Sequence, residues 1–383
     1  PILTMFFLTT YGVLNVTAGI ERLLEIPSFR PKFKVHWFFS LLGTIGCFAV
    51  MFLINSLATV IAIFFIGIVY TWLRRRRLKT TWGDVRSGML LQIIRYALLR
   101  LEKEANPKSW RPNILVLSGS LSKRWHLIEF ANGIAQEKGL FTIATILPEK
   151  ETPQEKVSNY EKQITDYLNN KKIRALVRVT RSEKIFQGAV QLVNSYGLGL
   201  LVPNTILLGE SKELDHKEEY ADMISHFYKS KRNVIIMQDF ISEDFREKKS
   251  VDIWWGGLKG NGGLMMILGY LMHNSPYWPN ITVNIKMVVK TKEAATGAER
   301  NLKEILSGMR VNFNTKVLVS KGQVFWDILK KESANSDLVM LGLKTPDKNF
   351  SEYFEHLKEN TKSLKKKIFV LASQDIEFKD VLD

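Results

Sequence analysis

The sequence predicts a membrane α-helical segment followed by an α/β region of two tandem lobes with parallel sheets. Two observations lead to this prediction. The run from Trp37 to Leu73 contains no charged side chain and ends abruptly at Arg74–Arg77. From Asn113 onward, short apolar runs alternate with longer helical patterns, which is typical of parallel strands joined by crossover helices.

The uncharged run is too long for one span. A single helix from Trp37 to Leu73 would reach roughly 55 Å, nearly twice the ~30 Å hydrocarbon core, so the chain must turn back once. The polar pair Asn55-Ser56 predicts the turn and leaves spans at residues 37–54 and 57–73. Residues 1–20 are also uncharged and rich in Phe, Leu, Ile and Thr, and they predict a third span.

The basic residues predict the orientation of these spans, because Lys and Arg are retained on the cytoplasmic side. They gather between residues 22 and 34 and again at Arg74–Arg77, whereas the Asn55-Ser56 turn has none. We therefore expect a multi-pass protein of the cell membrane, with residues 1–77 forming the membrane part and the remainder cytoplasmic. Residues 1–20 lack the basic start of a signal peptide, and we expect further membrane helices upstream.

Composition narrows the function classes. The net charge of +16 and pI near 9.6 could indicate nucleic acid, but the sharpest arginine cluster follows a span, where topology and anionic lipid explain it. We therefore expect no nucleic-acid partner. Cys47 is the only cysteine and lies in a span, and the histidines show no HExxH or paired spacing. No metal site and no catalytic constellation is predicted, so the chain is not expected to be an enzyme.

Residues 78–112 read as an amphipathic connecting helix and a linker. Val85, Met89, Ile93, Ala97 and Leu101 recur every four residues across a predicted helix from about residue 82 to 105. This apolar stripe either packs on the following domain or serves a membrane surface or subunit pairing. Pro107 and Pro112 follow this predicted helix and mark the linker.

The cytoplasmic part divides into lobe 1 (113–241) and lobe 2 (250–383), separated by the charged stretch 242–249. Each lobe contains five short apolar runs that predict strands, with four helical patterns between them. The predicted strands are 114–117, 141–147, 174–180, 205–208 and 234–238 in lobe 1, and 252–255, 282–289, 316–319, 338–343 and 367–371 in lobe 2.

Several motifs together resemble the cation-chloride cotransporter family. FFLTTYGVLN at 6–15, PSFRPKFK at 27–34 and the charge-free hairpin resemble the last three transmembrane helices of that family. GLGLLVPNTILLG at 197–209 and VDIWWGGLKGNGGLMMILGYL at 251–271 continue the series through the cytoplasmic domain. The resemblance implies electroneutral symport of K⁺, Na⁺ or both with Cl⁻ by an inverted-repeat core of the amino acid-polyamine-cation superfamily. It also implies a homodimer formed through a regulatory cytoplasmic domain of two universal-stress-protein-like lobes.

Tyr11 is the one residue to which the resemblance assigns an ion. It matches a family tyrosine whose hydroxyl contributes to a chloride site. A phenol can donate a hydrogen bond to a desolvated anion without placing a fixed charge in the membrane. The alternative is that Tyr11 only packs or sits at the membrane interface.

Two glycine-containing loops are candidates for a ligand. Ser118, Gly119, Ser120 and Ser122 join a predicted strand to a predicted helix and could meet a phosphate, or they form an ordinary turn with Ser122 as the N-cap. No cofactor is required, and ATP as a regulatory ligand stays open. Asp252, Trp254, Trp255, Gly262 and Gly263 match the family's motif in lobe 2, where we expect a structural role, with the two indoles buried on opposite faces.

The function predicted from these observations is the C-terminal part of a secondary active cation-chloride cotransporter. One alternative is a membrane-anchored module whose lobes sense a nucleotide. The other is an amino-acid or polyamine permease of the same superfamily, which explains the double-lobed tail poorly.

Overall fold

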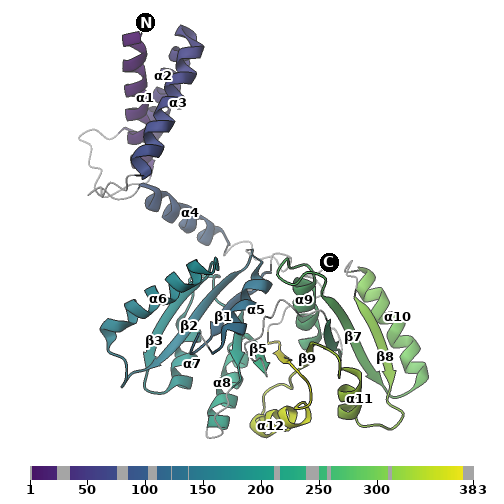
Figure 1. Cartoon of the computed structure of the whole chain (residues 1–383). Helices are drawn as coiled ribbons and strands as arrows, with labels where there is room; N and C mark the ends of the chain where they lie inside the picture. The colour runs from purple at the N-terminus through teal and green to yellow at the C-terminus, as the bar shows by residue number, and fades with distance from the viewer. Residues whose placement is uncertain are drawn as a thin grey trace. The chain divides into compact units, whose positions relative to one another are not determined.

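The computed structural model describes residues 2–23, 35–75, 85–101, 110–121, 123–136, 138–210, 216–238, 250–256, 260–308 and 313–373. The chain forms two compact units, Pro1–Glu104 and Ala105–Asp383. Figure 1 shows the elements of both units. The first unit is helical, and the second is built on one sheet.

The membrane unit contains three helices that are long and apolar enough to cross a bilayer: α1 (Ile2–Leu23), α2 (Trp37–Ile54) and α3 (Ser56–Arg75). The chain turns at Asn55, as the sequence predicted. Small residues bring α1 and α2 together. A Cβ added at Gly19 would lie 3.3 Å from Ser40, and one added at Gly43 would lie 3.3 Å from Asn15. Thr44 donates a hydrogen bond of 3.5 Å to the Gly12 carbonyl. Close approach of this kind is how helices associate where lipid removes the hydrophobic driving force.

Helix α4 (Val85–Leu101) follows in the same unit. Its apolar side chains remain exposed, among them Leu91 at 65% and Ile93 at 60%. Met89, at 41% exposed, and Ile93 both belong to the stripe expected from the sequence.

Lobe 1 alternates strands and helices in the predicted order. Its elements are β1 (Asn113–Leu117), α5 (Trp125–Ala135), β2 (Leu140–Pro148), the short helix η2 (Gln154–Lys156), α6 (Val157–Asn170), β3 (Leu176–Ser182), α7 (Ile185–Ser195), β4 (Thr205–Gly209), α8 (Lys217–Lys229) and β5 (Asn233–Gln238).

Lobe 2 repeats the pattern. Its elements are β6 (Ser250–Trp254), α9 (Asn261–His273), β7 (Thr282–Val289), α10 (Lys292–Gly308), β8 (Asn314–Val319), α11 (Phe325–Glu332), β9 (Leu338–Gly342), α12 (Phe350–Asn360) and β10 (Lys367–Leu371).

The ten strands form one sheet in the order β3-β2-β1-β4-β5-β10-β9-β6-β7-β8. Within each lobe all neighbouring strands are parallel, which confirms the predicted fold class. The two lobes meet where β5 and β10 pair antiparallel, with Met237 opposite Ile368. In chain order, β6 to β10 of lobe 2 correspond to β1 to β5 of lobe 1. Lobe 2 therefore has the same strand order as lobe 1, running in the opposite direction across the sheet, and a local twofold axis relates the two lobes.

Helices cover both faces of the sheet. The core of one face draws on α5, α6, α9 and α10, and the core of the other on α7, α8, α11 and α12. Each core contains residues of both lobes, so the lobes share their hydrophobic interior. At the junction, Ser275 donates a hydrogen bond of 2.9 Å to the carbonyl of Gly133, and Lys217 lies 2.9 Å from Glu355. The sheet and both helix layers therefore join the lobes.

Candidate functional sites

Tyr11 lies on the face of α1 that does not pack against α2. Its side chain is 58% exposed, as are those of Phe7 (51%) and Leu14 (58%), which lie one turn away on the same face. Among the described residues the Tyr11 hydroxyl has no hydrogen-bond partner. The phenol is therefore free to donate to a ligand that approaches this face of the helix.

Lobe 1 places the predicted phosphate loop at the carboxyl ends of β1 and β4. The strand order reverses between these two strands, and open α/β sheets bind ligands at such switch points. Ser118 is completely buried, and its hydroxyl lies 3.4 Å from that of Thr145. Gly119 has φ +59°, and the Ser120 carbonyl accepts a hydrogen bond from the Arg124 amide. Ser122 lies outside the described residues.

Arg124 fills the switch point of lobe 1. It precedes α5 in the N-cap position, and its guanidinium donates a hydrogen bond of 3.1 Å to the carbonyl of Glu210. A Cβ at Gly209 would lie 3.3 Å from the Arg124 side chain, so Arg124 packs closely over the end of β4. Burial raises the pKa of the neighbouring Tyr220 hydroxyl, although Arg124 opposes this shift, and that hydroxyl donates to the Gly209 carbonyl. A phosphate at this loop would meet a guanidinium that already has a backbone partner.

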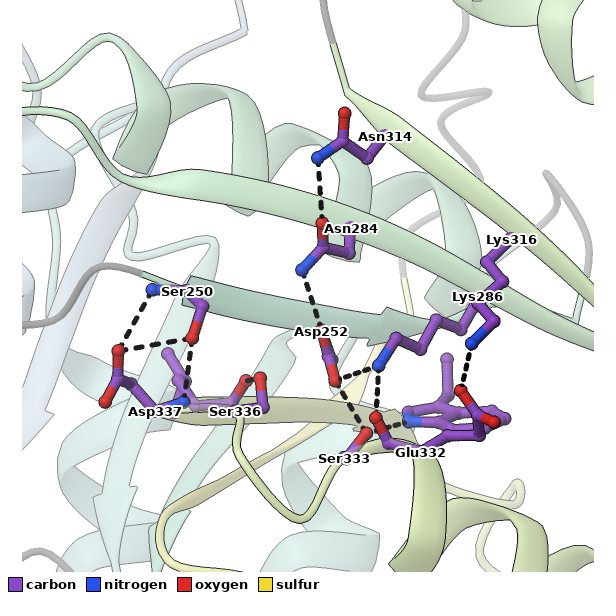
Figure 2. A network of polar contacts seen from close by, with 12 residues as sticks. Ser250, Asp252, Asn284, Lys286, Asn314, Lys316, Glu332, Ser333, Ser336 and Asp337 are labelled. Carbon is purple, nitrogen blue, oxygen red and sulfur yellow. Dashed lines mark hydrogen bonds and ion pairs between the residues drawn. The ribbon is translucent and has the colours of Figure 1, made fainter.

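Lobe 2 surrounds Asp252 with a buried polar network, which Figure 2 shows. Lys286 Nζ lies 2.5 Å from Asp252 Oδ2, and both side chains are nearly inaccessible. Ser333 donates to the same oxygen at 2.7 Å, and Asn284 donates to the other oxygen at 2.9 Å. Trp254 in turn donates to the Ser333 hydroxyl at 3.0 Å. The carboxylate therefore receives three donors, which is what a buried charge requires to be tolerated.

The two indoles of the motif point to opposite faces of the sheet, as predicted. Trp254 belongs to the core beneath α11 and α12, and Trp255 belongs to the core shared with α5 and α9. Both are largely buried, at 5% and 7% exposed. Gly262 and Gly263 are buried in the first turn of α9. The motif thus links β6 to both helix layers.

The switch point of lobe 2, between β6 and β9, holds a cavity of about 320 Å³. Its walls are largely aromatic and aliphatic, and the lining residues are Trp254, Gly256, Asn261, Gly262, Met265, Phe325, Trp326, Leu341, Gly342, Tyr353 and Leu357. Asn261 is held by two backbone partners, the Leu343 carbonyl at 2.6 Å and the Ala372 amide at 2.7 Å. The two switch points therefore differ: the Arg124 side chain lies at one, and the other holds a cavity lined mainly by aromatic and aliphatic residues.

Sequence reasoning missed Arg124, Lys286 and Ser333. Lys286 and Ser333 come from elements far along the chain from Asp252, and no spacing rule connects them to it. For Lys286 a weak signal existed: it is the single charged residue inside a strand that is otherwise uncharged, which predicts a buried partner. The described residues contain no group of three or more His, Cys, Asp or Glu side chains that could hold a metal ion.

The sequence matches solute carrier family 12 at residues 124–239 and 210–324, which together span more than half of the chain. The chain belongs to this family, the cation-chloride cotransporters. The cytoplasmic domain of a prokaryotic cation chloride cotransporter has a similar fold, with a TM-score of 0.52 and 17% identity over 70% of this chain and 99% of that one. A universal stress protein from Archaeoglobus fulgidus is also similar, with a TM-score of 0.45 and 12% identity over 69% and 98% of the two chains.

Proposed function

We propose that this chain contributes three membrane helices and the cytoplasmic domain to a secondary active symporter of K⁺, Na⁺ or both with Cl⁻. The main support is the combination of apolar spans with a ten-stranded double lobe in a chain of this family. The chain carries no step of covalent chemistry in this proposal. Its membrane helices form part of a midplane ion site, in the manner of inverted-repeat transporters.

In this proposal Tyr11 donates a hydrogen bond to the transported chloride. The supporting observation is its unpartnered hydroxyl on the exposed face of α1. A hydroxyl donor suits chloride in a membrane because it stabilises the anion without trapping it as a fixed positive charge would. Tyr11→Phe removes this donor and keeps the ring.

The test is Rb⁺ uptake by the full-length protein reconstituted in proteoliposomes, with chloride present or replaced by gluconate. We expect chloride-dependent uptake that Tyr11→Phe weakens by roughly tenfold, equivalent to about 1.4 kcal/mol for one hydrogen bond to an ion. Tyr70→Phe is the matched control, since Tyr70 is an equally exposed tyrosine (57%) near the end of α3. Uptake indifferent to chloride, or transport of an amino acid instead, would overturn the proposal.

The cytoplasmic domain serves dimerisation and regulation in this proposal. For dimerisation, α4 supplies a supporting observation from the segment that precedes the domain in the chain: its exposed apolar side chains offer a surface that a second copy can cover. ATP is proposed as a regulatory ligand at the lobe 1 loop, with Arg124 released from Glu210 to meet a phosphate. Calorimetry with ATP on the full chain tests this, and Arg124→Gln should abolish the heat. Binding that survives this change would place the nucleotide elsewhere.

A further inference from the structure

The amino-terminal edge of lobe 1 gathers loops from the whole lobe. The five strands β1 to β5 are parallel, so the segments that precede them meet at one edge. Asn204 holds this edge together. Its side chain accepts the Asn113 amide at 3.0 Å and donates to the Arg111 carbonyl at 2.7 Å, and its carbonyl accepts the Asn233 amide. We call this surface the amino edge of lobe 1.

The amino edge is strongly basic. Its exposed basic side chains are Arg111, Lys138, Lys171, Lys172, Arg174, Lys229 and Lys231. The segments preceding the five strands contain a single acidic residue in the sequence, Glu137. Within the described part of the chain, the first five of these side chains form no ion pair. Their charge is therefore available to an external anionic surface.

A short hairpin displays leucines at the same edge. Leu198 and Leu201 pair antiparallel through hydrogen bonds of 3.0 and 3.4 Å, and Gly199 between them has φ +56°. The hairpin exposes Leu198 at 65%, Leu200 at 50% and Leu201 at 37%. The backbone hydrogen bonds of the hairpin keep these leucines exposed to water, although exposure of apolar side chains to water is energetically unfavourable.

Neighbouring strands extend this leucine tip into a patch. Leu140 at the start of β2 is 47% exposed and Leu176 at the start of β3 is 56% exposed. Leu140, Leu176, Leu198 and Leu201 all line one hollow of about 610 Å³, so the four side chains border the same space. An exposed apolar patch of this kind on an ordered surface marks an interaction site.

We propose that the amino edge of lobe 1 docks on an anionic lipid surface. The leucine tip enters the boundary between headgroups and acyl chains, and the surrounding Lys and Arg side chains contact the lipid phosphates and carboxylates. Apolar and basic side chains on one edge match the chemistry of such a surface, which is apolar beneath a negatively charged layer. The chain carries its own apolar spans, so a bilayer is always present, and the polypeptide enters lobe 1 at this edge through Trp110–Asn113.

The opposite ends of the same strands provide an internal comparison. Glu183 follows β3 at the carboxyl edge of lobe 1 and is exposed. An environment-sensitive fluorophore can be placed at either edge through a single cysteine, because Cys47 is the only native one. The two probes are Leu200→Cys and Glu183→Cys, each in a Cys47→Ser background.

The experiment uses the full chain in nanodiscs of phosphatidylcholine alone or mixed with phosphatidylserine. The label at 200 is expected to shift to the blue and to be quenched by a lipid-borne quencher only when phosphatidylserine is present. The label at 183 is expected to stay in water in both. Neutralising three bases, by Lys171→Gln, Lys172→Gln and Arg174→Gln, should lower the ratio of docked to undocked label on the order of a hundredfold, because each base near an anionic surface contributes about 1 kcal/mol.

Three results would overturn the proposal. The first is a label at 200 that remains in water with phosphatidylserine present. The second is equal quenching of the labels at 183 and 200, which would mean that the domain has no preferred face. The third is a blue shift at 200 in detergent without lipid that grows with protein concentration, which would assign the surface to a second copy of the chain.

Discussion

Lys286 and Lys316 stand opposite each other on β7 and β8, and each binds a carboxylate at 2.5 Å. They differ in burial. The Lys286 and Asp252 side chains are 10% and 2% exposed, whereas those of Lys316 and Glu332 are 54% and 20% exposed. Lys286 also donates a hydrogen bond of 2.6 Å to the Glu332 carbonyl. Because the two lysines are neighbours on the same sheet (Figure 2), Lys286→Met and Lys316→Met compare a buried pair with an exposed one.

The expected losses follow from that burial. Lys286→Met leaves a buried carboxylate without its cation, which typically lowers the free energy of unfolding by 3–5 kcal/mol. Asp252 keeps its bonds from Ser333 and Asn284, so we expect the lower end, about 3 kcal/mol. Lys316→Met removes an exposed pair and should cost about 0–1 kcal/mol. Adding Asp252→Asn to Lys286→Met removes the stranded charge and should recover part of the loss.

The assay is a urea titration of the full chain in detergent micelles, followed by hydrogen exchange of peptides from β6 and β7 so that the cytoplasmic sheet is read separately from the membrane helices. The reasoning is refuted if the two single variants lose equal stability. It is also refuted if Lys286→Met loses less than about 1 kcal/mol, since the network would then contribute no more than a surface pair.

Three further predictions concern the junction and core of the cytoplasmic domain. Gly133→Ala would bring a Cβ of lobe 1 to 2.5 Å from the Trp278 ring of lobe 2, and it should lower the free energy of unfolding measured in thermal melts by about 1–3 kcal/mol. The control is Gly297→Ala, whose Cβ would meet nothing within 4 Å. Equal effects of the two changes would contradict the packing argument. Burial raises the pKa of the Glu355 carboxyl, but hydrogen bonds from Lys358 and Lys217 outweigh the effect of burial, so the pKa in the folded protein is lowered. The stability that this carboxylate contributes is therefore present above its pKa in the unfolded chain, and it is lost as the pH falls through its pKa in the folded protein. Melting temperatures measured against pH should consequently fall less steeply in acid for Glu355→Gln, and superimposable curves would argue against this linkage. Trp255→Ala should lower the free energy of unfolding by about 3–5 kcal/mol, because it removes an indole that is 7% exposed in the core shared by the two lobes, and unchanged thermal melting would contradict this packing role.

Sequence reasoning located the secondary structure closely where the pattern was local. The spans were predicted at 37–54 and 57–73, and the helices run over Trp37–Ile54 and Ser56–Arg75. The strands β7 and β10 were predicted with their observed bounds. These elements depend on runs of apolar residues and on charge, which the sequence displays directly.

The pairing of β5 with β10 could not be predicted. Both strands are buried along their whole length, so their residues carry no alternation of polar and apolar side chains to indicate a direction or a register. The two lobes read as separate five-stranded units for this reason. The shared sheet results from the burial of two strand edges that would otherwise lie open.

The same division applies to the candidate sites. The sequence by itself determined the membrane spans, the order of the α/β elements, and the location of the Asp252 motif and the Ser118–Ser120 loop. The tertiary structure alone decided what those residues meet: Lys286 and Ser333 around Asp252, Arg124 over the loop of lobe 1, and five loops gathered at one basic, leucine-bearing edge. Local patterns report how each segment buries its own apolar face, whereas partners brought together by parallel crossover connections come from segments tens of residues apart.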